Sequence, residues 1–251
     1  MSELAIIGGT GLDKIPNLEI VKREVSHTPF GEPSAPLTHG RLGGRDIIFL
    51  PRHGSGHSIP PHHVNYRANL WALHHVGVKT IIGVAAVGGI TSAMAPGKIV
   101  IPDQIIDYTF GRDHTLYGAD LSHVTHIDFT YPYCESLRKR LIDAGRSSGV
   151  EPIAGATYGA TQGPRLETAA EIIRMERDGC HIVGMTGMPE ASLAREFNLC
   201  YASCAVVSNW AAGKGDHPIS MKEIEVNLLD GMEQVKTLLI ALLAQWSSQD
   251  A

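Results

Sequence analysis

TIIGVAAV at residues 80–87, followed by Gly88 and Gly89, is the stretch that decides the fold. An apolar run of this length that ends in glycines is typical of a strand buried on both faces of a sheet. Similar runs, each flanked by Gly or Pro, lie at Leu4 to Ile7, Ile47 to Leu50, Lys98 to Pro102, His181 to Met185 and Leu199 to Ser208. Because such strands need helices on both sides, we expect an α/β fold with one central sheet, mixed but mostly parallel, flanked by helices.

Helical patterns fill the intervals between these strands. Positions with helical spacing are Val64, Ala68, Trp71 and His75 in a segment starting near Pro61, then Leu137, Leu141 and Ala144, and finally Ile224, Leu228, Val235, Leu239 and Leu242. Ser220 and Glu223 have the S-x-x-E spacing of a capping box. We therefore expect the last helix to begin there.

The composition limits the domain count and the partners. The chain has 251 residues and a formal net charge of -5, with no linker-like stretch, so residues 1–251 are expected to form a single domain. A protein that binds the phosphate backbone of nucleic acid needs clustered Lys and Arg, so no such partner is expected. No apolar run approaches the roughly 20 residues that span a bilayer, and the start MSELAIIGGTG lacks signal-peptide features. We expect a cytoplasmic protein without membrane association.

The four cysteines are Cys134, Cys180, Cys200 and Cys204. They form no CxxC pair, and a chain of this length does not need disulfide bonds for stability. We expect all of them to be reduced core residues.

A glycine-rich turn follows the first expected strand. The segment AIIGGTG at residues 5–11 brings backbone N–H groups and the Thr10 hydroxyl to a place where an anion can approach closely. It is not a full dinucleotide fingerprint, because Lys14 replaces the next expected glycine, and no Walker lysine motif follows. An ordinary strand-end turn is the alternative.

Arg52 and His53 follow a second expected strand, in FLPRHGSGH at residues 49–57. Arg52 can bind phosphate oxygens through two parallel N–H groups, and His53 can donate beside it. Since open α/β sheets bind ligands at strand ends, one interpretation is a phosphate site built from these two loops. The other is a surface arginine beside a capping histidine.

Further candidates follow other strand ends. AAVGGI at residues 85–90 and MTGMPE at residues 185–190 repeat the pattern of an apolar strand that ends in glycine. TQGPRLET at residues 161–168 has the character of a loop entering a helix. Its Glu167 can accept hydrogen bonds from a ligand or simply favour the helix N-terminus.

Metal and serine-hydrolase chemistry find no support in the sequence. Adjacent histidines such as His62 and His63 cannot both point into one site from a helix, and no HExxH cluster is present. No G-x-S-x-G elbow is present either. No metal site is expected.

A series of motifs along nearly the whole chain resembles that of the trimeric purine nucleoside phosphorylases. The motifs are IIGGTG, TPFGEPS, RHGxxH, NYRANLWAL, PGKIVIPDQIIDYT, THIDF, GPRLET and GMTGMPEASLA. The N-terminal half is most similar to the branch that acts on 5'-methylthioadenosine. The resemblance implies a nucleoside phosphorylase-like fold, a homotrimer, and a nucleoside and inorganic phosphate as substrates, with no metal or organic cofactor.

The resemblance also implies roles for single residues. Phosphate would be held by Thr10, Arg52, His53, the Ala86 backbone and Thr186. Met185 would lie against the ribose, and His126 would reach into the site of a neighbouring subunit. One departure is Ala85, which stands where the methylthioadenosine enzymes have a phosphate-contacting threonine.

The base pocket departs from the 6-aminopurine pattern. Similar enzymes for 6-aminopurines have an Asp where this chain has Asn209, and a second Asp where it has Ala211. An amide NH2 can donate to a 6-keto oxygen and to N7, and Glu167 can accept the N1–H that only 6-oxopurines carry. Asn209 and Glu167 resemble the pair of the inosine and guanosine phosphorylases, so a hypoxanthine-like base is expected.

The residues expected around the 5' position of the sugar resemble a different branch of the family. Inosine and guanosine phosphorylases have a histidine for the 5'-hydroxyl where this chain has Met221, followed one turn later by Ile224, while His57 and Pro61 match the methylthioadenosine branch. Methionine and isoleucine cannot pair with a hydroxyl but pack well on a methylthio group. The expected substrate is therefore S-methyl-5'-thioinosine.

The implied reaction is phosphorolysis to hypoxanthine and 5-methylthioribose 1-phosphate. No side chain needs to attack the sugar: Arg52 and His53 would hold phosphate, and Asn209 would stabilise the departing purine. Alternatives are an inosine/guanosine phosphorylase, a 5'-methylthioadenosine phosphorylase, a nucleoside hydrolase, and a non-catalytic nucleoside or phosphate sensor.

Overall fold

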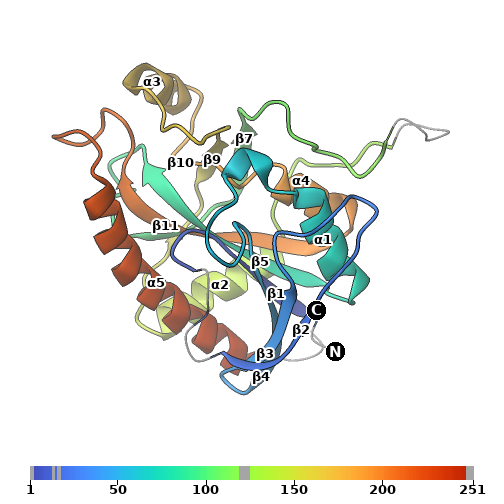
Figure 1. The fold of residues 1–251 in the computed structure, drawn as a ribbon. Helices are drawn as coiled ribbons and strands as arrows, with labels where there is room; N and C mark the ends of the chain where they lie inside the picture. Colours follow the sequence, from blue (N-terminus) through green and yellow to red (C-terminus); the bar gives the residue numbers. More distant parts are fainter. Residues whose placement is uncertain (1–2, 13–14, 16–17, 119–124, 247–251) are drawn as a thin grey trace.

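The computed structural model describes residues 3–12, 15, 18–118 and 125–246 (Figure 1). Its centre is an 11-stranded sheet. The strands are β1 Leu4–Gly8, β2 Glu19–Glu24, β3 Leu37–Leu42, β4 Arg45–Pro51, β5 Thr80–Gly89, β6 Ile99–Ile101, β7 Gln104–Asp107, β8 Ile153–Ala154, β9 Thr157–Ala160, β10 Ile182–Gly184 and β11 Cys200–Trp210.

The apolar strand β5 organises the sheet. Its first half pairs in parallel with β1, its whole length pairs in parallel with β11, and its last residues pair antiparallel with β10. The remaining order is β2-β3-β4-β1 on one side and β10-β9-β7 on the other, with β6 beside β11 and β8 beside β6. The expected mixed, mostly parallel sheet is confirmed.

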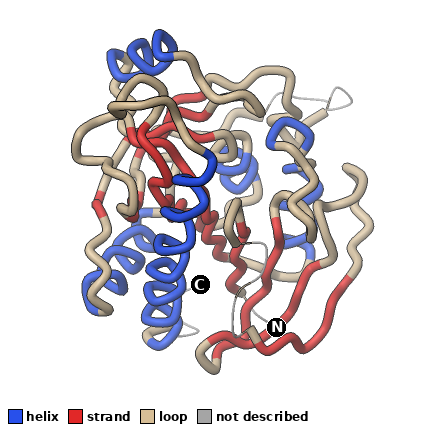
Figure 2. The backbone as a smooth tube through the Cα atoms, turned by 60° about the vertical axis from the view of Figure 1, so that its left-hand side comes forward, coloured by secondary structure: helices blue, strands red, loops and turns tan. Residues whose placement is uncertain are grey.

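Helices cover the sheet on both faces. They are the 3-10 helix η1 Pro61–His63 and the α-helices α1 Tyr66–His75, α2 Glu135–Ser147, α3 Ala169–Arg177, α4 Glu190–Glu196 and α5 Met221–Ala244. One buried cluster joins α1 and α4 to the sheet, and a second joins α2 and α5 to the opposite face. Figure 2 shows helices on both sides of the twisted strands. The expected α/β layering is confirmed.

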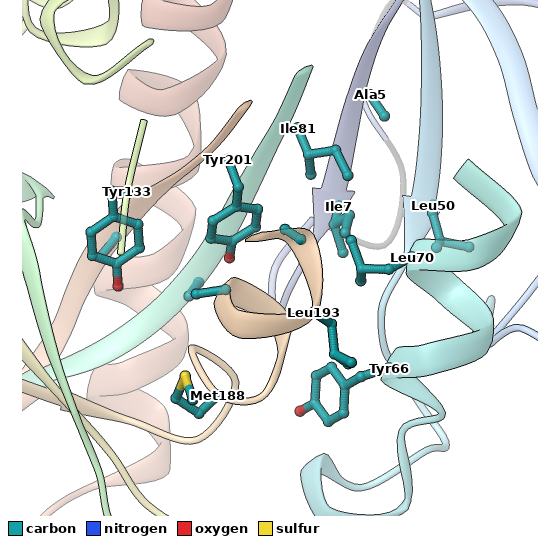
Figure 3. Close-up of a cluster of buried hydrophobic side chains, with 14 of the residues drawn as sticks. Ala5, Ile7, Leu50, Tyr66, Leu70, Ile81, Tyr133, Met188, Leu193 and Tyr201 are labelled. Carbon is teal, nitrogen blue, oxygen red and sulfur yellow. The ribbon is translucent and has the colours of Figure 1, made fainter. Parts of the chain in front are cut away.

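Buried apolar side chains and one glycine allow the helices to pack closely against the sheet. In the first cluster, Leu70 of α1, Leu193 of α4 and Ile7 of β1 are fully buried (Figure 3). On the opposite face, a Cβ at Gly231 of α5 would lie only 2.3 Å from Cγ1 of Val206 on β11. Glycine therefore allows α5 to approach the strand that carries Asn209.

The start expected for the last helix is confirmed, but its expected capping box does not form. The helix begins at Met221, but the Ser220 side chain makes no capping hydrogen bond. The Glu223 carboxylate instead lies 3.4 Å from Nε2 of His217. A complete capping box is present in α3, between Thr168 and Glu171.

The expectation of reduced cysteines is half wrong. Cys134, which precedes α2, is disulfide-bonded to Cys200 at the start of β11, whereas Cys180 and Cys204 are free and buried. Spacing rules for nearby cysteines could not detect this pair, because the fold brings together two residues 66 positions apart. Within the described ranges, no helix combines the length and the apolar character needed to cross a membrane.

Candidate active site

The predicted site residues come together at the strand ends. All of them except His126 line one cavity of about 610 Å³, formed by the loops after β1, β4, β9 and β10, by the last residues of β5 and β11, and by the first turns of α5. Ala85 and Ala211, the two departures noted from the sequence, also line it. The glycine-rich strand ends therefore converge on a single site.

Two loops meet at one end of this cavity. The backbone N–H of Arg52 donates to the Gly8 carbonyl at 2.8 Å, which ties the loop after β4 to the loop after β1. A Cβ at Gly9 would lie 2.6 Å from the Val84 carbonyl oxygen and 2.9 Å from Nη1 of Arg52. Glycine is required at this position because the chain passes directly against Arg52.

Glu190 is a site residue that the sequence analysis missed. Nε and Nη2 of Arg52 donate to its two carboxylate oxygens at 2.6 Å each, and Nη1 donates to the Val84 carbonyl at 2.8 Å. Tyr201 adds a hydrogen bond of 2.8 Å to the Glu190 carboxylate. Burial by itself lowers the pKa of Arg52, but the charge and hydrogen bonds of Glu190 outweigh burial and raise that pKa above its ordinary value.

This pair changes the interpretation of Arg52. The two-pronged edge of the guanidinium that the sequence analysis assigned to phosphate is occupied by Glu190. Three of the five guanidinium N–H groups are used, so one on Nη1 and one on Nη2 remain for further acceptors. The acidic residue after Met188 and Pro189 was a weak sequence signal, because Glu is also common in the first turn of a helix.

His53 and His57 lie side by side next to Arg52. The Nδ1–H of His53 donates to the Ile59 carbonyl at 2.8 Å, which fixes this tautomer and directs Nε2 elsewhere. The two imidazole rings have centroids 4.7 Å apart. Nε2 of His57 lies 3.5 Å from the Thr10 hydroxyl. Three polar side chains from two loops are thus gathered at one end of the cavity.

Asn209 lies at an irregularity in β11. The pairing of β11 with β5 shifts register between Val207 and Asn209, and Asn209 lines the cavity. The Ser208 hydroxyl donates to Oδ1 of Asn209 at 2.8 Å, and Nδ2 of Asn209 donates to the Trp210 carbonyl at 2.7 Å. These bonds fix which end of the amide is oxygen and leave one Nδ2–H for a ligand rather than the two expected.

Glu167 is held in the same cavity by its neighbour in the loop. Its Oε1 accepts a hydrogen bond of 2.7 Å from the Thr161 hydroxyl, which leaves Oε2 as an acceptor. The capping box of α3 begins one residue later, at Thr168. Glu167 therefore lies just before a capped helix, which limits its freedom.

One wall of the cavity is apolar. Ile219, Met221, Ile224 and Leu228 line it near the start of α5, with Pro61 from η1. Met221 is 65% exposed, whereas Leu228 is 5% exposed, so the wall is open at its outer end and closed at its inner end. Met185 lies against the loop after β9, where a Cβ at Gly163 would approach its Sδ to 2.4 Å.

His126 is the one predicted site residue outside the cavity. It is exposed and lies in an irregular segment that follows the undescribed residues 119–124. In the described part of the chain, no group of three or more His, Cys, Asp or Glu residues could hold a metal ion.

The glycine-rich strand ends surround one cavity whose lining is polar in one part and apolar in another. This arrangement is typical of an α/β protein that binds a small ligand at its strand ends. Residues 3–244 match the Phosphorylase superfamily, and the chain belongs to it. The resemblance expected from the motifs is thus confirmed.

Individual relatives refine this placement. The chain is 53% identical over 244 residues to a protein of Pseudomonas syringae pv. tomato named probable S-methyl-5'-thioinosine phosphorylase, covering 97% of this chain and 99% of that protein. It is 45% identical over 248 residues to the 6-oxopurine nucleoside phosphorylase of Pyrococcus furiosus, covering 97% and 92%. A solved structure of methylthioadenosine phosphorylase from Schistosoma mansoni with adenine has a TM-score of 0.92 and 34% identity, covering 97% of this chain and 91% of that one.

Proposed function

We propose that this protein catalyses the phosphorolysis of S-methyl-5'-thioinosine to hypoxanthine and 5-methylthioribose 1-phosphate. The observation that carries the proposal is that one cavity contains both an amide, Asn209, and an apolar wall that includes Met221 and Ile224. Relatives named probable S-methyl-5'-thioinosine phosphorylase support the same substrate. The products place the protein in purine and methylthio-sugar salvage.

The base preference follows from the orientation of two side chains. With Oδ1 of Asn209 facing the Ser208 hydroxyl, the amide presents an N–H, which suits N7 or the 6-keto oxygen. Oε2 of Glu167 can accept the N1–H of a 6-oxopurine. A 6-aminopurine has a lone pair in place of the proton on N1, so its N1 would set an acceptor against this carboxylate, and such mismatches can cost a factor on the order of 10⁴ in kcat/KM.

The sugar preference follows from the apolar wall. A 5'-hydroxyl buried against Met221, Ile224 and Leu228 would lose its hydrogen bonds to water without replacement, at roughly 1–3 kcal/mol. A methylthio group has no such requirement and packs on the same surface. The two ends of the nucleoside are thus selected by different residues.

Phosphate would bind among Thr10, Arg52, His53, the Ala86 backbone and Thr186. The C1'–N9 bond breaks with its electron pair passing to the purine, and a phosphate oxygen forms the new bond to C1'. The proton that the monohydrogen phosphate loses balances the one that hypoxanthine gains. Arg52, His53 and Asn209 act by orientation and charge stabilisation, so neither metal nor organic cofactor is part of the proposal.

The assembly and the location belong to the same proposal. A homotrimer in the cytoplasm would bring His126 of one subunit to the cavity of the next, beside Met185 at the ribose. The exposure of His126 is compatible with a place at an interface, and closed rings of identical chains are a common way to complete a site.

The test is hypoxanthine or adenine release from methylthioinosine, inosine and methylthioadenosine, each with and without phosphate. We expect turnover only with phosphate and the highest kcat/KM for methylthioinosine. Equal turnover without phosphate would identify a hydrolase, and ligand binding without turnover would identify a sensor. Sedimentation on the same sample is expected to give a trimer.

An inosine phosphorylase is the second candidate. The outer part of the apolar wall is open, since Met221 is 65% exposed, so solvent could reach a 5'-hydroxyl there. The relative from Pyrococcus furiosus named 6-oxopurine nucleoside phosphorylase supports this alternative. The comparison of inosine with methylthioinosine decides between the two.

A further inference from the structure

Arg112 is a buried cation that the proposed reaction leaves without a role. It lies in the loop between β7 and α2 and is 8% exposed. No carboxylate among the described residues pairs with it. Its guanidinium instead donates to the carbonyls of Met185 at 2.9 Å, Met188 at 2.6 Å, Thr161 at 3.1 Å and Gln162 at 2.7 Å, to Oε1 of Gln162 at 3.0 Å, and to the Tyr66 hydroxyl at 3.3 Å.

These acceptors belong to two different segments that carry site residues. Residues 161–167 follow β9, and the Thr161 hydroxyl in this segment holds Glu167. Residues 185–188 follow β10 and contain Met185 and Thr186, which line the cavity. Nη2 of Arg112 donates to carbonyls of residues 161–162, and Nη1 donates to carbonyls of residues 185 and 188. One guanidinium therefore connects the two segments.

The positions of these acceptors require an arginine at residue 112. Its donors lie in one rigid plane and point in several directions, so they can satisfy carbonyls on two sides at once. A lysine offers three donors on a single atom and cannot reach both segments with the same geometry. Without Arg112, the buried carbonyls would be left unpaired or would turn toward other donors, and either outcome moves the two segments.

We propose that Arg112 is a positioning residue that sets the distance between the Glu167 side and the Thr186 side of the cavity. This inference rests on the proposed function, in which Glu167 meets the purine and Thr186 meets phosphate. A nucleoside and phosphate react only when both are held at the right separation, and a displacement of about 1 Å can reduce the rate on the order of 100-fold.

Arg138 provides a matched control. It is 7% exposed and donates to the Pro102 carbonyl at 2.8 Å, so it likewise supports backbone by a buried guanidinium, and unlike Arg112 it also pairs with a carboxylate, that of Glu135. None of its hydrogen-bond partners lines the cavity. Arg138→Met should therefore lower the Tm and leave kcat/KM within about twofold of the wild type below that temperature.

The experiment is a double-mutant cycle. Arg112→Met and Arg112→Lys are each made in the wild type and in a Glu167→Gln, Thr186→Ala background, and kcat/KM is measured where circular dichroism shows folded protein. We expect both Arg112 variants to lose about 100-fold in the wild type but less than about tenfold in the second background, because the residues through which Arg112 acts are already removed.

Each other outcome overturns the inference. Equal losses in the two backgrounds would show that Arg112 does not act through Glu167 and Thr186. Full activity of Arg112→Lys would show that its charge, rather than its planar reach, matters. A failure of both Arg112 variants to fold, while Arg138→Met folds, would show that Arg112 supports the fold rather than the site.

Failure of the proposed function would appear elsewhere, in the wild type's own substrate preference. The cycle is run with whichever of the three nucleosides the wild type consumes fastest. The Arg112 result is a ratio between variants, so it is read separately from the identity of that nucleoside.

Discussion

Arg52 and Glu190, 138 residues apart in the sequence, form a two-bonded ion pair inside the protein. Their side chains are 1% and 0% exposed, and both bonds are 2.6 Å long. Arg52 follows β4 and Glu190 is the first residue of α4. The orientation of the arginine at the proposed phosphate site therefore depends on a helix from the other half of the chain.

Glu190→Gln should destabilise the protein and weaken phosphate binding together. The variant leaves the charge of Arg52 buried without its counter-charge, and breaking a buried pair in this way costs about 3–5 kcal/mol. We expect the free energy of unfolding in urea to fall by that amount and the KM for phosphate to rise on the order of tenfold, as Arg52 loses its fixed orientation.

The control is Asp46→Asn, which breaks the exposed pair between Arg41 and Asp46 at 2.9 Å. Exposed pairs contribute about 0–1 kcal/mol, so neither quantity should change appreciably. If Glu190→Gln and Asp46→Asn have equal effects, Glu190 has no special role at the site.

The central strands were predictable because strands buried on both faces are apolar along their length, and an apolar run is visible in the sequence. β5 and β11 are apolar along nearly their whole length and flanked by glycines or a turn, which identifies them without any tertiary information. β2 was missed because it is an exposed edge strand with the polar sequence EIVKRE. β9 was missed because TYGA is short and has no apolar run, and its burial comes from neighbours distant in the sequence.

The candidate site was predictable only where a motif stands next to a strand end. Thr10, His53 and Asn209 follow or end apolar strands, and all three line the cavity. Glu190 and Arg112 were missed because their importance lies in partners far away in the sequence, which local spacing cannot show. The two N–H groups of Arg52 that pair with Glu190 were expected to bind phosphate for the same reason.

Glu171 should make stability depend on pH at the acid end. Arg165 and the Thr168 backbone N–H lower the pKa of Glu171 from 4.5 to about 2. Because the folded-state pKa is lowered, this stabilisation is fully present above pH 4.5 and is lost as the pH falls toward 2. The Tm of the wild type should therefore fall more than that of Glu171→Gln between about pH 5 and pH 2.5.

Thr168→Ala removes the other half of the same capping box. It should cost about 1 kcal/mol at neutral pH, measured by urea unfolding. Parallel Tm profiles of the wild type and Glu171→Gln across the acid range would contradict this account of the α3 cap.

Asn209→Asp should shift the base preference toward 6-aminopurines. Oδ1 still accepts from the Ser208 hydroxyl, and the other oxygen gives up the hydrogen bond that Nδ2 donates to the Trp210 carbonyl. That oxygen can then accept from a 6-amino group or, when protonated, donate to N7. We expect the ratio of kcat/KM for methylthioinosine to that for methylthioadenosine to fall at least tenfold, although Glu167 limits the gain. An unchanged ratio would remove Asn209 from the selection of the base.

Met221→His should change the sugar end alone. The imidazole supplies a hydrogen-bond partner for the 5'-hydroxyl and removes apolar contact from the methylthio group, each worth roughly 1–2 kcal/mol. The kcat/KM for inosine should therefore rise and that for methylthioinosine fall, while the preference between methylthioinosine and methylthioadenosine stays as in the wild type.

Because Met221 begins α5 and Asn209 lies on β11, the Asn209→Asp, Met221→His double variant should show nearly additive changes in free energy. We would measure kcat/KM for all three nucleosides on the wild type, both single variants and the double variant. If the wild type already uses inosine as well as methylthioinosine, the apolar wall does not select the substrate.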